Sequence, residues 1–295
     1  MQKVIQMNLK ITDVRALKGD SAFLIDDGKT SILYDSGFAF TGYRVAENIK
    51  KELQDRKLDY IFLTHSHYDH ALGSVYVKKL YPDAKVVAGE YAAKIFAKES
   101  ARRVMRDLDR KFAKACGVAE YEDLIDELSA DITVTDNDLI QAGEMSFRVV
   151  DLPGHTRCSV GFYLESEKLL LGSETLGVFD GESTVVPSYL VGIGLTLDSI
   201  DKATSLDIEY ILLPHYGLLQ KELTKVYLTN AKKSAVETFE EIATLLREGK
   251  SKAECVEFFK KKFYKGYIRT IYPIDAMMLN TSITVDLIAK EIGIE

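Results

Sequence analysis

The five histidines of this chain stand where they could hold metal ions. Three of them fall in one hexapeptide, His65-Ser66-His67-Tyr68-Asp69-His70. It directly follows Tyr60–Thr64, an apolar run typical of a buried strand. Side chains two residues apart in an extended segment point the same way, so His65 and His67 can bind one ion. The chain is expected to turn into a helix next, so that Asp69 and His70 face a neighbouring point and can bind a second ion, for which zinc, iron or manganese is suitable.

Three further candidate ligands follow later strands. His155 comes after an apolar run and a Pro-Gly turn, Glu174 after a run of leucines, and His215 after the run Tyr210–Leu213 and a proline. Ligand sites of sheet proteins gather at one edge of the strands, on loops held by a rigid scaffold. The alternative is a set of unrelated solvated histidines, but since every histidine follows a strand, the pattern favours one shared metal site.

In its motifs the chain resembles the metallo-β-lactamase fold superfamily. The motifs occur in the order of that family: Tyr34-Asp35-Ser36-Gly37, Thr64-His65-Ser66-His67-Tyr68-Asp69-His70, Pro153-Gly154-His155-Thr156, Gly172-Ser173-Glu174-Thr175 and Leu213-Pro214-His215. The resemblance implies an α+β fold, a four-layer αββα sandwich with a dinuclear metal site on its edge. The helical spacing of apolar residues in the sequence adds a helical insertion at about 90–130 and a C-terminal helical extension.

The resemblance also implies a role for each ligand. The first metal would be held by His65, His67 and His155, and the second by Asp69, His70 and His215. Glu174 stands where the family usually has a bridging aspartate, and Asp35 where an aspartate supports the loop of the first two histidines.

The chain departs from the family pattern at two places. Ser173-Glu174 replaces the usual Gly-Asp, and the longer glutamate could bridge two ions, widen the site, bind one ion only or remain a solvated carboxylate. Arg157-Cys158 stands where Pro-Gly is common, so the Cys158 thiolate is a further candidate ligand. Its position favours the alternative, in which it begins a buried strand.

The chemistry expected of such a site is metal-assisted hydrolysis. Two divalent ions about 3.5–4 Å apart turn a bound water into hydroxide near neutral pH. Zinc is favoured, with iron or manganese as alternatives, and Asp69 is the expected catalytic residue, orienting the nucleophile and moving its proton. The bond cleaved would be an ester, thioester, lactone or phosphoester. The main alternative is a mononuclear iron dioxygenase of the same fold acting on a sulfur substrate; a nuclease and a non-enzymatic protein with a relict site are disfavoured.

The elements that must position these residues alternate in the first part of the chain. Strands are predicted in two batches with helices between them, beginning with Val4–Ile11, and a Gly/Pro-interrupted loop is expected at Gly177–Gly194. The sequence after about Leu219 is predicted to be helical throughout. We therefore predict a catalytic domain at 1–218 and a helical extension at 219–295.

The amino-acid composition and net charge limit the kinds of binding partner that the sequence predicts. The chain has 295 residues, 46% of them hydrophobic, with 38 Lys and Arg against 45 Asp and Glu, a net charge of −7. The acidic balance argues against nucleic acid, and no apolar run is long enough for a membrane span. Three cysteines and no apolar leader favour a cytoplasmic protein. The expected partner is a small-molecule substrate, and a homodimer is left open.

Two segments offer alternatives for substrate choice. Lys94–Lys114 is locally basic, either a lid that attracts an anionic substrate or a solvated face balanced by the acidic stretch Glu120–Asp131. Aromatic residues of the tail, at 263–272, could line a pocket mouth together with Tyr189. The alternative, that they are packing anchors, is the more common use of such residues.

Overall fold

The structure is a computed structural model that describes residues 8–294. Its first sheet has six strands in chain order, so that each strand pairs with the next. They are β1 (Lys10–Asp13), β2 (Phe23–Asp26), β3 (Ser31–Tyr34), β4 (Tyr60–Leu63), β5 (Lys85–Gly89) and β6 (Ile132–Val134). The first half of the predicted strand Val4–Ile11 lies outside the described residues, and the described strand begins only at Lys10.

The second sheet also has six strands, in the order β14-β13-β10-β9-β8-β7. They are β7 (Leu139–Ala142), β8 (Met145–Asp151), β9 (Val160–Leu164), β10 (Leu169–Leu171), β13 (Tyr210–Leu213) and β14 (Gly217–Leu219). A two-stranded ribbon, β11 (Val178–Phe179) with β12 (Val185–Val186), lies inside the segment that the sequence predicts as a long loop.

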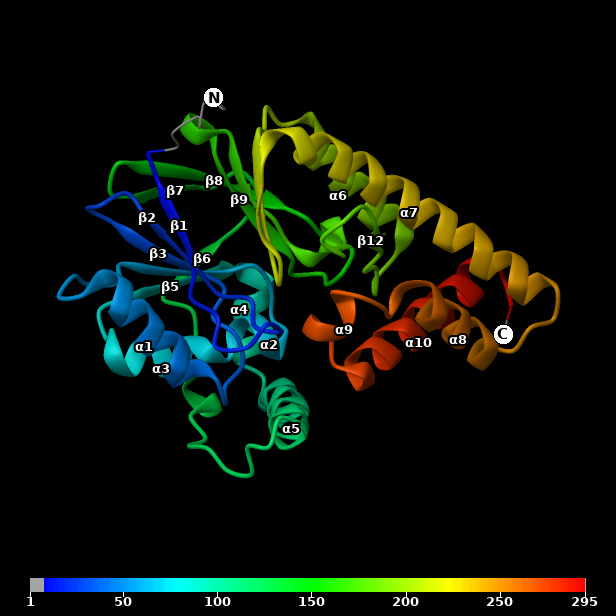
Figure 1. Cartoon of the computed structure of the whole chain (residues 1–295), viewed down its shortest axis with the longest axis horizontal. Coiled ribbons are helices and arrows are strands. Elements are labelled where there is room, and N and C mark those ends of the chain that lie inside the picture. The colour runs from blue at the N-terminus through cyan, green and yellow to red at the C-terminus, as the bar shows by residue number, and fades with distance from the viewer. Residues whose placement is uncertain (1–7, 295) are drawn as a thin grey trace.

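Helices cover the outer faces of both sheets, which gives the four layers seen in Figure 1. The helices on the first sheet include α1 (Gly42–Leu53), α2 (Tyr68–Ala71) and α3 (Gly73–Leu80), and those on the second are α6 (Ile193–Ser205) and α7 (Lys221–Arg247). The sequence pattern did not predict α6. One apolar cluster lies between the sheets, with Phe62, Phe147 and Phe162 at its centre, and separate clusters lie under each helical layer. The α+β sandwich expected from the sequence is therefore confirmed.

The insertion and the extension are both helical. The insertion holds α4 (Glu90–Phe96), α5 (Glu99–Ala115) and the 3₁₀ turn η1 (Ile125–Glu127). After α7 come α8 (Lys252–Phe263), α9 (Ile268–Ile271) and α10 (Ile274–Glu291), which share an apolar core of their own with the end of α7. Figure 1 shows α7 running from the second sheet to these helices. The division into two domains at residue 218 stays a prediction.

The basic segment of α5 is paired within the insertion. Arg106 and Arg110 contact Asp123, and Arg102 contacts Asp126, at N–O distances of 2.7 to 3.2 Å. These aspartates belong to the acidic stretch predicted to balance the segment. The structure therefore favours the balanced face over a lid that attracts an anionic substrate.

A buried carboxylate ties α5 to the loop beneath it. Asp109 accepts a hydrogen bond from the Ala39 amide at 2.9 Å and another from the Tyr121 hydroxyl. Burial raises the pKa of Asp109 to about 7, although these hydrogen bonds act to lower it. Because α5 also contacts α2, this carboxylate helps to support the helix that carries Asp69 and His70.

Because the pKa of Asp109 is raised in the folded chain, the free energy of unfolding should fall as pH rises. The folded chain holds a proton on this carboxyl that the unfolded chain releases near pH 4, so its contribution is full below pH 4 and is lost as pH rises to about 7. Each pH unit in this window costs roughly 1.4 kcal/mol. The free energy of unfolding, measured with urea at pH 5 and at pH 8, should therefore differ less between the two pH values for Asp109→Asn than for the wild type. Asparagine keeps the shape of the side chain and one oxygen that can accept from the Ala39 amide. If the change between pH 5 and pH 8 is as large in Asp109→Asn as in the wild type, the prediction is wrong.

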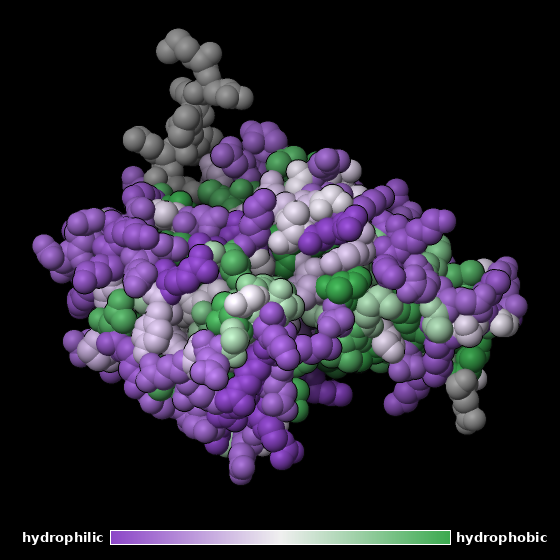
Figure 2. Space-filling view, turned by 60° about the horizontal axis from the view of Figure 1, so that its bottom comes forward, coloured by the Kyte–Doolittle hydropathy of each residue, from purple (hydrophilic) through white to green (hydrophobic). Residues whose placement is uncertain are grey.

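The surface is mostly hydrophilic. Figure 2 shows this on one face, where apolar side chains gather toward the side of the C-terminal helices. Among the exposed apolar residues, α10 contributes Ile274, Leu279 and Ile283. Of the helices within residues 8–294, none has the length and apolar character needed to span a bilayer.

Candidate metal centre

Four strand ends deliver the candidate ligands to one edge of the sandwich. His65 follows β4 of the first sheet, while His155, Glu174 and His215 follow β8, β10 and β13 of the second. Because β10 and β13 are parallel neighbours, their carboxyl ends open at the same edge. His67 is the residue before α2, and this short helix carries Asp69 and His70. The two sheets thus supply the site from opposite sides.

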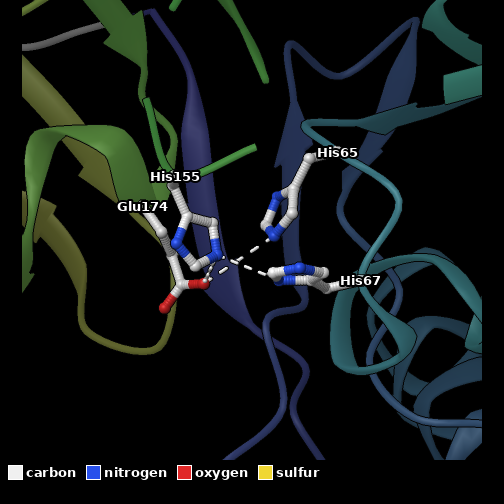
Figure 3. A group of neighbouring side chains, drawn as sticks. All are labelled: His65, His67, His155 and Glu174. Carbon is white, nitrogen blue, oxygen red and sulfur yellow. Dashed lines mark hydrogen bonds and ion pairs between the residues drawn. The ribbon is translucent and has the colours of Figure 1, made fainter. Parts of the chain in front are cut away.

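The first group of ligand atoms comprises His65, His67, His155 and Glu174. Each offers one ligand atom, and these atoms all lie within 4.8 Å of one another. Figure 3 shows His65 and His67 on the side of the first sheet, facing His155 and Glu174 across the gap. His155 Nε2 lies 2.9 Å from His67 Nδ1 and 2.8 Å from Glu174 Oε2.

The second group comprises Asp69, His70 and His215, under the same distance limit. His70 Nε2 and His215 Nε2 are 3.2 Å apart, and each lies 3.6 Å from Asp69 Oδ2. Glu174 reaches this group too, since Oε2 is 3.5 Å from His70 Nε2 and Oε1 is 3.5 Å from His215 Nε2. All seven residues predicted from the sequence are therefore brought together, with the Glu174 carboxylate between the two groups.

Hydrogen bonds on the far side of the rings fix which nitrogen faces the centre. His155 Nδ1 lies 3.1 Å from the Ser188 carbonyl, and His215 Nδ1 lies 3.0 Å from the Gly19 carbonyl. A carbonyl only accepts, so each Nδ1 carries a proton and Nε2 is the nitrogen that faces the centre. This is the form in which imidazole binds a metal.

Asp35 organises the other side of the centre. Its carboxylate lies 2.8 Å from His70 Nδ1, and it accepts hydrogen bonds from the Thr64 amide at 2.9 Å and the Thr64 hydroxyl at 3.0 Å. That hydroxyl in turn lies 2.9 Å from His65 Nδ1. Asp35 has a φ of 52°, a left-handed conformation that Asp and Asn tolerate better than most residues. This one carboxylate therefore positions a candidate ligand of each group.

Asp35→Asn is expected to weaken metal binding about 10- to 100-fold, because partners that orient a ligand contribute at this level. Asparagine can keep the left-handed backbone conformation of Asp35. Its side chain has only one oxygen, however, so it cannot accept hydrogen bonds at both positions that the carboxylate oxygens occupy. A chelator competition titration with zinc measures the effect. Asp26→Asn, which changes an ion pair with Arg56 and a hydrogen bond from the Gly28 amide, is the matched control. Equal affinity in the Asp35 and Asp26 variants would show that the carboxylate is not needed to orient these rings.

The electrostatics of the centre also suit a cation. Burial and the neighbouring rings lower the pKa of His65 and His67 well below the usual value, so both are neutral. For His70, burial acts to lower the pKa, but Asp69 and Asp35 outweigh it and raise the value. Burial acts to raise the pKa of Glu174, yet His155 and the other imidazoles hold it well below its usual range.

Two buried atoms at the centre have no hydrogen-bond partner within the described residues. They are His65 Nε2 and Glu174 Oε1, and both belong to the side chains that enclose the centre. A buried acceptor left unpaired costs about 1–3 kcal/mol, whereas a cation would satisfy both atoms. The donor set of imidazoles and carboxylates therefore fits divalent metal ions at this place.

Contacts from distant segments hold His215. This residue has a φ of 61°, and its carbonyl accepts from both the Arg15 guanidinium and the Tyr267 hydroxyl, the latter at 2.6 Å. The ring of Tyr272 lies beside that of His215, with centroids 6.4 Å apart. Sequence reasoning gave no role to Arg15 and treated the tail aromatics as a mere alternative, since no motif marks them.

Cys158 has a packing role in the described chain. It is buried in the core beneath the first sheet, and its thiol donates to the Ser66 hydroxyl at 3.3 Å. It belongs to neither of the two ligand groups. Tyr189 is likewise fully buried, among the C-terminal helices, so it anchors packing and does not line a pocket mouth.

Comparison with known proteins gives a family match and several distant relatives. A family model described as "Metallo-beta-lactamase superfamily" matches residues 18–215. Glyoxylase B2 of Dictyostelium discoideum is 29% identical over 134 residues, 45% of this chain and 41% of that protein. Hydroxyacylglutathione hydrolase of Francisella philomiragia is 28% identical over 199 residues, 65% of this chain and 64% of that protein. The chain thus covers less than two thirds of the length of these relatives.

Solved structures share the fold over most of the chain. A metallo-beta-lactamase family protein from Thermus thermophilus aligns with a TM-score of 0.62 at 20% identity, covering 92% of this chain and 88% of that one. A beta-lactamase domain protein from Burkholderia ambifaria aligns with a TM-score of 0.63 at 14% identity, covering 98% of this chain and 88% of that one. At such identities the likeness concerns the fold alone.

Proposed function

The chain belongs to the metallo-β-lactamase superfamily, and from this premise we propose that it is a dinuclear metallohydrolase that cleaves a thioester. The observation that carries the proposal is the place of Glu174, whose carboxylate lies between two complete ligand groups. His65, His67 and His155 would hold one ion, Asp69, His70 and His215 the other, and Glu174 would bridge them. The longer glutamate thus serves where an aspartate is usual in the family.

The two ligand groups suit hydrolysis. When two divalent ions are bound, they supply hydroxide at neutral pH and polarise the oxygen of the bond to be cleaved. Asp69 is partly exposed, unlike the buried histidines around it, and its carboxylate faces His70 and His215. This position supports the proposal that Asp69 orients the nucleophile and holds its proton.

A thioester is the first substrate to test, because curated relatives are named hydroxyacylglutathione hydrolase. Hydrolysis adds water across the C–S bond. A C–O bond forms at the carbonyl carbon, the C–S bond breaks, and the sulfur leaves as a thiol with a proton that Asp69 can deliver. Zinc is the proposed metal, with iron and manganese as alternatives, and the proposed setting is the cytoplasm.

The test combines metal analysis with a substrate panel. We expect two divalent ions per chain, and hydrolysis of acyl-glutathione thioesters in preference to lactones and phosphodiesters. Removal of metal by a chelator should abolish activity, and zinc should restore it. One iron per chain with oxygen consumption on a sulfur substrate would instead support the dioxygenase alternative and overturn the proposal.

A further inference from the structure

Tyr272 differs from Tyr34, Tyr264 and Tyr267 in how its hydroxyl is used. Tyr34 donates to the Gly172 carbonyl, Tyr264 to that of Tyr272 and Tyr267 to that of His215. Tyr272 instead accepts a hydrogen bond from Asn280 Nδ2 at 2.9 Å. Its own hydroxyl hydrogen has no acceptor among residues 8–294, so it is available to a ligand.

Tyr272 also stands between the metal centre and a pocket. Its ring lies beside His215, and the carboxylates of Glu174 and Asp69 are close enough to raise its pKa, after burial. On the other side it lines a small cavity together with Ser188, whose hydroxyl lies 2.8 Å from His155 Nδ1. The cavity is thus next to residues that contact a candidate ligand of each metal.

The size and lining of this cavity limit what it can take. Its volume is about 20 Å³, and no charged side chain lines it. The walls come from the β11–β12 segment and from α8 and α10: Val178, Val186, Pro187, Leu190, Phe259, Met277, Thr281 and Thr284. A space of this size holds about one water molecule or one methyl group.

We propose that the cavity beside Tyr272 is the acyl subsite of the metal centre, and that Tyr272 donates a hydrogen bond to the carbonyl oxygen of the substrate. The inference rests on the proposed thioester hydrolysis and names its substrate class, a thioester whose acyl group is short and uncharged. A phenol at neutral pH keeps its proton and can stabilise the negative charge that develops on that oxygen. The helical extension is therefore part of the active site.

The role of Tyr272 is tested by removing its hydroxyl. In Tyr272→Phe, kcat for propionyl-glutathione should fall roughly 10²-fold while KM changes little, because the hydrogen bond strengthens as charge develops. Metal content should stay at the wild-type level. Tyr264→Phe is the matched variant, since it removes a neighbouring hydroxyl that contacts only the main chain of Tyr272. An equal loss of kcat in both variants would mean that Tyr272 acts only through packing, and would overturn its role as a donor.

The subsite is tested by enlarging it. Wild type should cleave acetyl- and propionyl-glutathione at least about tenfold better, in kcat/KM, than hexanoyl-glutathione. Met277→Ala should reduce or reverse the difference in kcat/KM between the short-chain thioesters and hexanoyl-glutathione. Met278→Ala should not, because Met278 packs against the helical core and is not part of the pocket lining. Val186→Ala, on the β12 side, replaces Met277→Ala if that variant fails to fold. An unchanged chain-length preference in the enlarged variant would overturn the subsite.

The binding of carboxylate products shows whether the proposed subsite or the proposed thioester hydrolysis has failed. Calorimetric titration of the metal-loaded chain with acetate, propionate and hexanoate should show the same preference for short chains, and Met277→Ala should remove it. If no thioester is cleaved but this preference is present, the proposed function fails and the subsite stands. If thioesters are cleaved and the carboxylates bind without regard to length, the subsite fails and the function stands.

Discussion

Replacing His67 with alanine is expected to remove most of the bound metal and all measurable hydrolysis. His67 Nδ1 lies 2.9 Å from His155 Nε2 and belongs to the first ligand group, so its loss leaves that group with two imidazoles and the shared carboxylate. A site with a missing ligand also loses the water activation on which the reaction depends. Elemental analysis of the purified variant, together with a thioester assay, measures both effects.

Ser66→Ala is the matched control for His67→Ala. Ser66 is the preceding residue of the same loop, and its hydroxyl contacts only the Cys158 thiol in the described chain. This variant should keep its metal and most of its activity. Full metal occupancy in His67→Ala would show that this imidazole is not a ligand, and the proposed centre would have to be abandoned.

Asp69→Asn is expected to lower kcat by about 10²- to 10⁴-fold, the usual contribution of a general acid or base. The amide keeps an oxygen near His70 and His215 but cannot hold a proton at neutral pH. Weaker binding of the second ion is also expected, because a neutral oxygen is a poorer ligand than a carboxylate. Assays at saturating zinc, with metal content measured in parallel, separate the two effects.

The control for Asp69→Asn is Asp83→Asn, which changes an exposed carboxylate in the turn after α3. It should leave kcat unchanged. If Asp69→Asn retains wild-type kcat at full metal occupancy, the proton is moved by another group, and Asp69 serves at most as a ligand.

The sequence by itself predicted the candidate ligands and the elements that carry them. The spacing of His65, His67 and Asp69 places three candidate ligands directly after one strand, and that relation is local in the chain. The runs before His155 and His215 predicted strands that the structure contains. The strand before His215 is buried on both faces and therefore leaves a short continuous apolar signal. Family resemblance then joined these pieces into one site, which spacing alone could not do.

The local pattern failed where structure depends on distant partners. The β11–β12 ribbon was missed because it lies in the Gly/Pro-interrupted stretch Gly177–Gly194, whose conformation depends on packing against the rest of the chain. The sequence pattern also did not predict α6, which follows this stretch. The charge pattern of α5 left a lid and a balanced face as alternatives. Only folding, which places Asp123 beside Arg106 and Arg110, distinguished them.

Tertiary structure alone decided how the ligands are oriented and what surrounds them. The carbonyl that fixes the His215 ring belongs to Gly19, 196 residues away, and the hydroxyl that holds its main chain belongs to Tyr267. No spacing rule relates such residues, because hydrogen bonds and packing act between atoms that are close in space and not in sequence. For the same reason the cavity beside Tyr272 exists only once α10 packs against the β11–β12 segment.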